Sequence, residues 1–490
     1  MKSLLFMLAL CLWASSAFGQ SISFHSGNKS GKKLPTQKLT HMLPSDTEGQ
    51  LLVVEYELNA TGVVKGVRVR QINEEWKESA SVKIDDTRRN STEQAFRTGD
   101  RIHLLLSSAD DDYYRMRHVV VSVAGLQVVS DSLLLDVKLA KGEVCYSWTA
   151  LSPEKSRVAV VHTVWNNNSK QSTASAMLFD GDMKKQWGQP LWYGDIQQML
   201  VTDRGEVVTA CLLSSKDHQE TLLRMNAADA SGRKQDEVVL KGDLEQVSLL
   251  NYTGGKLLCT ALEGDGGHGL IGKRKFTAFH VCLYDMNAST LRLDTRHAFS
   301  AEELCVFENV DTDTRLSSKS TNYIQRIEQE TTPGGGAVIY QRTWKEITRQ
   351  NGIDVSETIH RKGMLLANID TLGNLLWVRA IMQNNQNVSK VELSADLVVC
   401  DGKLYVFTNE AKDETNEYTP HLAAKRSKSL LMANAALAVY HFTADGRGAK
   451  QMLATDDKFI FHSPMFDFGG GNYYLLAGGM GPKVCHITIP

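Results

Sequence analysis

Proline is scarce in this chain, at 9 of 490 residues, and long hydrophobic runs are lacking. The most apolar internal stretch, 429–442, contains Asn434 and is shorter than a membrane-spanning helix requires. Neither charge is in excess, since 54 Lys and Arg stand against 56 Asp and Glu, a formal net charge of −2. Proteins that bind nucleic acid usually carry a basic surface. We therefore expect no integral membrane segment and no nucleic-acid partner.

Cysteine is also sparse. Of the 8 cysteines, Cys11 lies in the N-terminal apolar run, and each of the others sits singly in an apolar, strand-like stretch. No C-x-x-C sequence and no adjacent pair is present. This pattern predicts mostly buried free thiols. One or two disulfides stay open as an alternative if the chain is exported to an oxidising compartment.

The first 19 residues have the pattern of a signal peptide. Lys2 precedes an apolar run from Leu4 to Trp13, and small residues follow up to Gly19. A charged start, a short apolar run and small residues before the cleavage point are typical of secretory signals. We expect cleavage before Gln20 and export to the periplasm, the cell surface or the medium. The remaining residues, 20–490, are then one domain.

Signatures of common catalytic sites are absent from the sequence. There is no H-E-x-x-H zinc motif, no G-x-S-x-G nucleophile elbow and no phosphate-binding G-K-[ST]. No catalytic residue is assigned, and we expect no cofactor.

What the sequence does contain is a repeat. Eight times, a turn of Gly and polar residues is followed by an apolar run, at intervals of about 50 to 68 residues with one gap near 80. Such a run has the composition of a buried strand. The eight copies lie at 48–58, 99–106, 152–164, 203–213, 254–262, 333–344, 401–409 and 469–478.

A second unit, a hairpin, alternates with these turns. Its clearest copies are 177–191 and 366–380, in each of which an Asp is followed seven residues later by a Trp: Asp180 with Trp187, and Asp370 with Trp377. Because the two Trp recur at one place in the repeat, we expect them to pack between neighbouring units. Weaker copies lie at 56–66, 121–129, 223–234, 282–293 and 440–450.

Two hairpin signals per repeat indicate a four-stranded antiparallel sheet repeated along the chain. Stacking such sheets in a ring buries their faces and protects their edges. The sequence thus predicts an all-β fold, a β-propeller of seven or eight four-stranded blades, with eight favoured. Only one strand, 484–489, follows the last turn. The strand-like residues Ile22–His25 are expected to complete that blade and close the ring. A multi-domain sandwich and a solenoid are the alternatives.

Two segments carry a resemblance. The sequence ANIDTLGNLLW, 367–377, resembles the strand–turn–Trp repeat of the quinoprotein-like propeller class, and SPEKSRVAVV, 152–161, is similar to turns of bacterial exported β-propeller repeat proteins. The resemblance implies a propeller fold and no particular activity, because that fold serves many functions. Dehydrogenases of the class typically carry an adjacent cysteine pair, which this chain lacks.

Two stretches depart from the repeat, at 304–332 and 409–430, and are expected to be irregular insertions. A Gly-rich loop at 264–269 holds His268 and is followed by Lys273 and Arg274, which suggest an anion or sugar-acid site or a simple hairpin tip. Asp311 and Asp313 are candidate calcium ligands, but they lack the spacing of a complete calcium loop. No other metal site is expected.

These observations favour an exported, non-enzymatic, monomeric propeller that binds a protein or glycan through the rim and loops of one face. The alternative is a secreted carbohydrate-active enzyme, a hydrolase or lyase, with its site in the central funnel. A cluster of carboxylates with His or Arg at the channel mouth would favour the enzyme.

Overall fold

The computed structural model describes a subset of the chain, and every structural statement below refers to these residues: 22–26, 37–47, 49–58, 64–73, 75, 77–85, 91–110, 112–169, 171–192, 195–214, 220–252, 255–264, 276–300, 303, 321–350, 353–381, 385–387, 395–411, 435–453, 461–477 and 483–490.

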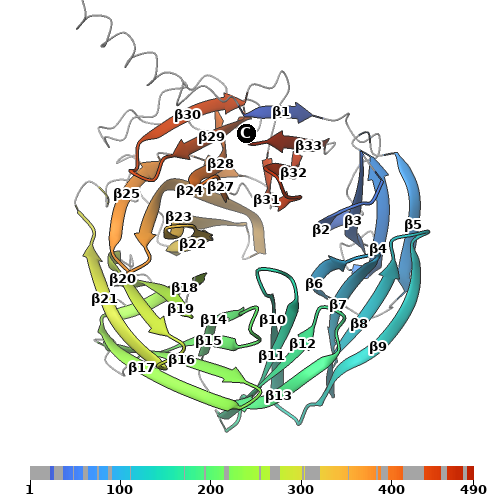
Figure 1. The fold of residues 1–490 in the computed structure, drawn as a ribbon, viewed down its shortest axis with the longest axis horizontal. Coiled ribbons are helices and arrows are strands. Elements are labelled where there is room, and N and C mark those ends of the chain that lie inside the picture. The colour runs from blue at the N-terminus through green and yellow to red at the C-terminus, as the bar shows by residue number, and fades with distance from the viewer. Residues whose placement is uncertain are drawn as a thin grey trace, which may run out of the picture.

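Eight antiparallel sheets are arranged in a ring (Figure 1). Each sheet is a blade, and the inner strand of one blade contacts the inner strand of the next around the circle. The protein is therefore an eight-bladed β-propeller. The favoured blade number is confirmed.

The first four blades use consecutive strands, which follow one another from the inner to the outer edge of each sheet. Blade 1 contains β2 (Gln37–Pro44), β3 (Gln50–Leu58), β4 (Val64–Asn73) and β5 (Glu78–Asp85). Blade 2 contains β6 (Ser91–Thr98), β7 (Arg101–Ala109), β8 (Tyr113–Ser122) and β9 (Gln127–Lys138). Blade 3 contains β10 (Glu143–Leu151), β11 (Arg157–Asn166), β12 (Gln171–Asp180) and β13 (Lys185–Leu191). Blade 4 contains β14 (Asp195–Val201), β15 (Val207–Ser214), β16 (Glu220–Asp229) and β17 (Gly232–Lys241).

The second half of the ring repeats the pattern with one addition. Blade 5 contains β18 (Asp243–Tyr252), β19 (Lys256–Gly264), β20 (Phe276–Asp285) and β21 (Thr290–Ala298). Blade 6 contains β22 (Thr321–Thr332), β23 (Gly335–Gln350), β24 (Ile353–Asp370) and β25 (Leu375–Ile381), with β26 (Asn385–Asn387) paired to β24. Blade 7 contains β27 (Ala395–Cys400), β28 (Lys403–Ala411), β29 (Ala435–Phe442) and β30 (Gly448–Leu453). Blade 8 contains β31 (Phe461–Asp467), β32 (Asn472–Ala477), β33 (Lys483–Thr488) and β1 (Ser23–Ser26).

Blade 8 closes the ring with strands from opposite ends of the described chain. The N-terminal β1 pairs antiparallel with β33, with Ser23 opposite Thr488 and Ser26 opposite Cys485. Figure 1 shows the two strands side by side. The prediction of closure by an N-terminal strand is confirmed, with the strand shifted by one residue from Ile22–His25.

The second strand of a blade lies between two neighbouring blades, which explains its unbroken apolar composition. In β19, every residue from Leu257 to Glu263 is buried. The outer strand β9 is instead exposed along most of its length. A strand covered on both faces reads as a continuous apolar run rather than an alternating one. All eight repeated turns of the sequence, of which only 152–156 contains no Gly, precede such second strands.

The hydrophobic core is divided among the blade interfaces. For example, Leu258 and Phe279 of blade 5 pack with Tyr340 and Leu365 of blade 6. A cluster of this kind spans each neighbouring pair of blades, including blades 8 and 1, where Val484 packs with Met42. Each blade is thus stable only against its neighbours.

Two details differ from the sequence expectations. The weak hairpin copy at 56–66 spans the connection from β3 to β4, whereas the strong copies connect third and fourth strands. Gly and polar residues occur in both kinds of turn. The local sequence therefore does not distinguish a turn between the second and third strands from one between the third and fourth. Within the expected insertion at 304–332, residues Thr321–Thr332 form β22, and 304–320 lie outside the described residues. Within 409–430, Asn409–Ala411 belong to β28 and the rest lies outside.

Candidate functional site

The long connections of this propeller share one face. In a blade of four antiparallel strands, the first and third turns lie at one end, and the second turn and the link to the next blade lie at the other. Here the second end, the loop face, carries the connections 265–275, 299–320, 382–394 and 412–434. These belong to blades 5, 6 and 7, which are consecutive in the ring. One further connection of similar length, 27–36, joins β1 to β2 at the same end of blades 8 and 1. The opposite end, the turn face, carries tight turns such as 371–374 and 401–402.

The residues singled out from the sequence lie in these long connections. His268, Lys273 and Arg274 belong to 265–275, between β19 and β20, and Asp311 and Asp313 belong to 299–320, between β21 and β22. All five lie outside the described residues, so their proposed binding and metal roles stay predictions. The strand ends on either side of 265–275 are described, and they hold a polar cluster.

Glu263 is the centre of that cluster, at the loop-face end of β19. Its carboxylate accepts hydrogen bonds from both Nε and Nη2 of Arg296, at 2.7 and 2.6 Å. Thr277 donates through Oγ1 at 2.9 Å, and His280 Nε2 lies 2.7 Å from Oε2. Glu263 is 7% exposed and His280 is 1% exposed. The side chains come from three adjacent strands of blade 5, and the strand register brings them together.

The electrostatics of the cluster follow from burial and pairing. Burial alone would raise the pKa of Glu263, but the hydrogen bonds from Arg296, His280 and Thr277 outweigh it and lower that pKa. Burial lowers the pKa of His280 against the opposing effect of Glu263. The imidazole is therefore neutral near pH 7 and donates from Nε2 to the carboxylate. Its buried Nδ1 has no hydrogen-bond partner among the described residues.

Blades 1 and 7 contain comparable buried carboxylates. Glu410 of β28 pairs with Lys450 and accepts a hydrogen bond from Tyr440, and both charged side chains are less than a tenth exposed. Glu55 of β3 pairs with Arg70 at 3.2 Å. Pairing with a cation and donors favours the ionised carboxylate. At Glu55, burial outweighs the pairing with Arg70 and raises the pKa. Both ion pairs hold neighbouring strands together.

The inner strands carry a recurrent irregularity. Register shifts occur in β2, β6, β14, β18, β22 and β31, where each pairs with its second strand. A bulge re-aims side chains and frees backbone groups. In several cases the next blade takes up the freed group.

Side chains bridge adjacent blades at these bulges. Thr149 of blade 3 donates to the carbonyl of Glu93 in blade 2, at 3.2 Å. In blade 8, the amide of Met465 donates to the carboxylate of Asp396 in blade 7. These hydrogen bonds join the inner strands of adjacent blades, and they occupy the carboxylate of Asp396.

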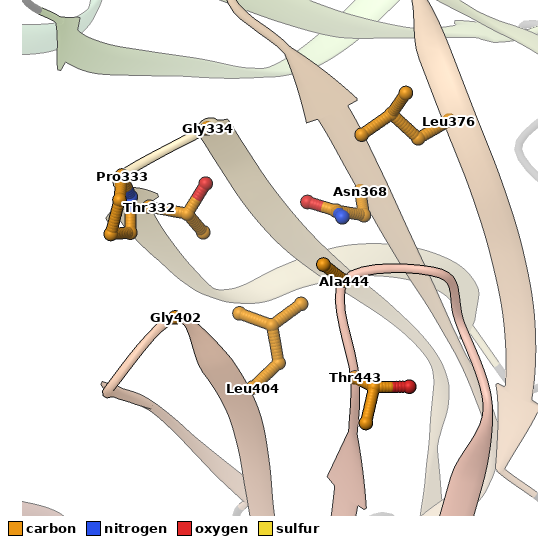
Figure 2. Close-up of a pocket in the computed structure, with 9 residues that line it drawn as sticks. All are labelled: Thr332, Pro333, Gly334, Asn368, Leu376, Gly402, Leu404, Thr443 and Ala444. Atoms are coloured by element: carbon orange, nitrogen blue, oxygen red, sulfur yellow. The ribbon is translucent and has the colours of Figure 1, made fainter.

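A pocket lies on the turn face between blades 6 and 7 (Figure 2). Its volume is about 200 Å³. It is enclosed by three turns and by side chains of β24, β25 and β28. The lining residues are Thr332, Pro333, Gly334, Asn368, Leu376, Gly402, Leu404, Thr443 and Ala444.

The two repeated tryptophans pack between blades, as expected. Trp377 is 8% exposed, packs with Phe442 of blade 7 and donates from Nε1 to the carbonyl of Ala444 at 2.9 Å. Trp187 packs partly buried in the cluster between blades 3 and 4. Their role is structural.

Other chemistry is limited in the part of the chain that is described. Six cysteines there are free thiols, all buried except the half-buried Cys400. Among these residues, no group of three or more His, Cys, Asp or Glu side chains lies close enough together to hold a metal ion. None of the described segments forms a helix long and apolar enough to cross a membrane.

The sequence did not reveal the Glu263 cluster or the pocket. The only local signal for the cluster is a Glu at the end of an apolar run, in LLCTALEG, and its partners lie on two later strands. The pocket is the space that the side chains of blades 6 and 7 leave unfilled. Neither arrangement is a local property of the sequence.

Comparison with known proteins identifies no family. No protein-family model matches the chain, and no curated protein matches it. Among solved structures, the WD40 domain of SCAP from fission yeast has a TM-score of 0.38 and 7% identity, covering 95% of this chain and 98% of that one. The β-propeller domain of the Trilobed protease from Pyrococcus furiosus has a TM-score of 0.33 and 8% identity, with 81% and 93% covered.

A polysaccharide lyase, an ulvan lyase in complex with a saccharide, is similar at a TM-score of 0.38 and 11% identity, with 68% of this chain and 80% of that one covered. These proteins differ in function, and the likenesses favour neither binding nor catalysis. The propeller assignment rests on the topology of the eight blades.

Proposed function

We propose that this protein is a non-enzymatic binding scaffold that holds a protein or glycan on the loop face of blades 5 to 7. One observation carries the proposal: four of the five connections of ten or more residues belong to one face of three consecutive blades. Binding residues are commonly placed on loops that a rigid scaffold positions. The ion pairs of Glu263 and Glu410 lie at the ends of strands from which two of these loops start, and they give the loops a fixed base.

The state of the buried acids supports binding over catalysis. Glu55, Glu263 and Glu410 each pair with a cation, and Asp396 accepts backbone amides of Leu397 and Met465. A general acid needs a carboxyl group with a raised pKa that reaches substrate. The pKa of Glu263 is lowered instead. Burial raises the pKa of Glu55, but that side chain is 2% exposed and paired with Arg70, so it does not reach a substrate.

The test is to replace 265–275 and 412–434, separately, with short Gly-Ser connectors. The matched control replaces the turn-face residues 371–374 in the same way. Wild-type and variant proteins are applied to a glycan array and to a panel of purified envelope proteins. We expect binding to be lost in a loop-face variant whose melting temperature is unchanged, and to persist in the control.

Catalysis is the competing outcome. Release of new reducing ends or unsaturated products from a polysaccharide by the wild-type protein would overturn the scaffold proposal in favour of a carbohydrate-active enzyme. Equal binding by all variants would remove the loop face from consideration.

We also propose that the protein is exported, with residues 1–19 acting as a cleaved signal peptide. The support is the charged, apolar and small-residue pattern of that segment. The intact mass of the protein recovered from the periplasm or medium should correspond to a chain that begins at Gln20. Retention of the full mass in the cytoplasm would contradict export.

A further inference from the structure

The pocket on the turn face stands out when the two Asp–Trp hairpins are compared. In β12 and β24, the residue two positions before the Asp lies directly opposite the Trp: Leu178 opposite Trp187, and Asn368 opposite Trp377. The hairpins thus have the same register. The same position is apolar in blade 3 and polar in blade 6.

In blade 3 this position fills the space toward the next blade. Leu178 is 2% exposed and belongs to the core cluster between blades 3 and 4. A Cβ atom placed on Gly205, in the first turn of blade 4, would lie only 2.9 Å from Leu178 Cδ2. The leucine therefore packs directly against that turn.

In blade 6 the equivalent space is hollow. Asn368 is 7% exposed, and its buried Oδ1 has no hydrogen-bond partner among the described residues. Figure 2 shows its amide directed into the pocket, toward Thr332 and above Ala444. A buried polar atom without a partner is costly, and such atoms are normally satisfied by protein, water or ligand. Blade 6 thus carries an unsatisfied polar group at a position where its sister blade has none.

The lining defines the chemistry that the pocket accepts. All nine lining residues are uncharged, so nothing there matches a phosphate or a carboxylate. The Asn368 amide offers one acceptor and one donor group. Leu404 and the half-exposed Leu376 supply apolar contacts beside it. A group with its own N–H, C=O and methyl complements this set.

The shape favours a compact ligand. The turns at Pro333–Gly334, Gly402 and Thr443–Ala444 border the pocket, as Figure 2 shows. An extended peptide is usually bound along a sheet edge or a groove, whereas this cup admits a single ring or side group.

We propose that this pocket, between blades 6 and 7, binds the acetamido group of an N-acetylated sugar. Asn368 pairs with the acetamide N–H and C=O, and Leu376 and Leu404 contact the methyl group. The site is on the face opposite the proposed loop-face surface and does not depend on it.

The experiment uses the full mature chain and four probes: N-acetylglucosamine, acetamide, glucose and a short glutamine-containing peptide. Saturation-transfer NMR detects binding, and calorimetry gives the affinity. We expect transfer to the acetyl methyl of N-acetylglucosamine, weaker transfer to acetamide, and none to glucose. Binding of glucose as strong as that of N-acetylglucosamine, or of the peptide alone, would overturn the proposal, as would the absence of binding by every probe.

Two variants test the location. Asn368→Leu introduces the residue found at the sister position, and Ala444→Leu fills the pocket from its exposed rim. Each should weaken N-acetylglucosamine binding by about tenfold or more. Ala230→Leu, at an exposed alanine in the equivalent outer hairpin of blade 4, is the matched control and should bind as wild type does. Because the two variants change lining residues of different blades, unchanged affinity in either folded variant would refute the site.

Discussion

At the scale of single residues, the buried ion pairs provide the sharpest tests. Arg70 joins Glu55 at 3.2 Å and Glu78 at 2.8 Å, and its side chain is 7% exposed against 2% for that of Glu55. Removing one partner of such a pair leaves the other as an unpaired buried charge. We expect Arg70→Met to lower the free energy of unfolding by about 3 to 5 kcal/mol, measured by urea denaturation.

The matched control is Arg68→Met on the same strand. Arg68 is 30% exposed and lies 4.0 Å from Glu57 and 3.9 Å from Glu78. Exposed pairs contribute about 0 to 1 kcal/mol. Similar losses in the two variants would show that the Arg70 pair is no stronger than a surface pair.

The histidine pair of blade 2 gives a pH dependence. His103 Nδ1 lies 2.9 Å from His118 Nε2, its Nε2 lies 2.7 Å from Thr98 Oγ1, and Phe96 stacks on its ring. Burial, with repulsion from His118, lowers the pKa of His103 from 6.5 to about 4. Between these values the unfolded chain binds a proton that the folded chain does not.

Stability from His103 is therefore complete above pH 6.5 and declines as the pH falls toward 4. The slope from this one group is at most about 1.4 kcal/mol per pH unit. His103→Gln should flatten the curve of unfolding free energy against pH over that interval. A curve parallel to that of the wild type would contradict the assignment, and a constant offset above pH 7 would not.

At the scale of the structural element, the Asp–Trp hairpin is the informative unit. Trp377 is buried against blade 7 and donates to the Ala444 carbonyl at 2.9 Å. We expect Trp377→Ala to cost about 3 to 5 kcal/mol of unfolding free energy. Trp187→Ala, in the sister hairpin, removes a partly buried ring and should cost less. An unchanged free energy of unfolding in Trp377→Ala would show that the indole ring does not contribute to the core.

These hairpins also show which structural features can be predicted from the sequence. Asp180 and Asp370 each accept backbone amides in the turn that follows, so the motif is set within a few residues and was predicted correctly. The predicted hairpin at 56–66 is present, but it joins the second and third strands of its blade, a position that its composition does not specify. The Glu263 cluster joins β19, β20 and β21, and only strand register brings those residues together.

At the scale of the whole molecule, the ring depends on its closure. Deleting the residues through Ser26 would leave β33 without its outer neighbour and expose its edge in blade 8. Ile22 and the half-buried Phe24 also contribute to the core between blades 7 and 8. We expect a much lower melting temperature and aggregation on heating, measured by calorimetry and light scattering.

The matched control begins at Gln20, keeps β1 and should melt as the full-length chain does. An unchanged melting temperature after removal of β1 would show that the other blades hold the ring without it. The eight-blade ring itself was predictable from the repeat, because each turn and second strand is a local pattern. The pocket beside Asn368 was not, because it arises between blades 6 and 7.

The pairing of β1 with β33 also sets an order of events during synthesis. Ser23 leaves the ribosome long before its partner Thr488 exists, and no other pairing among the described strands spans so much of the chain. Contacts this distant in sequence form slowly. Among the described strands the first therefore waits for the last, and we expect blade 8 to be the final part of the propeller to fold.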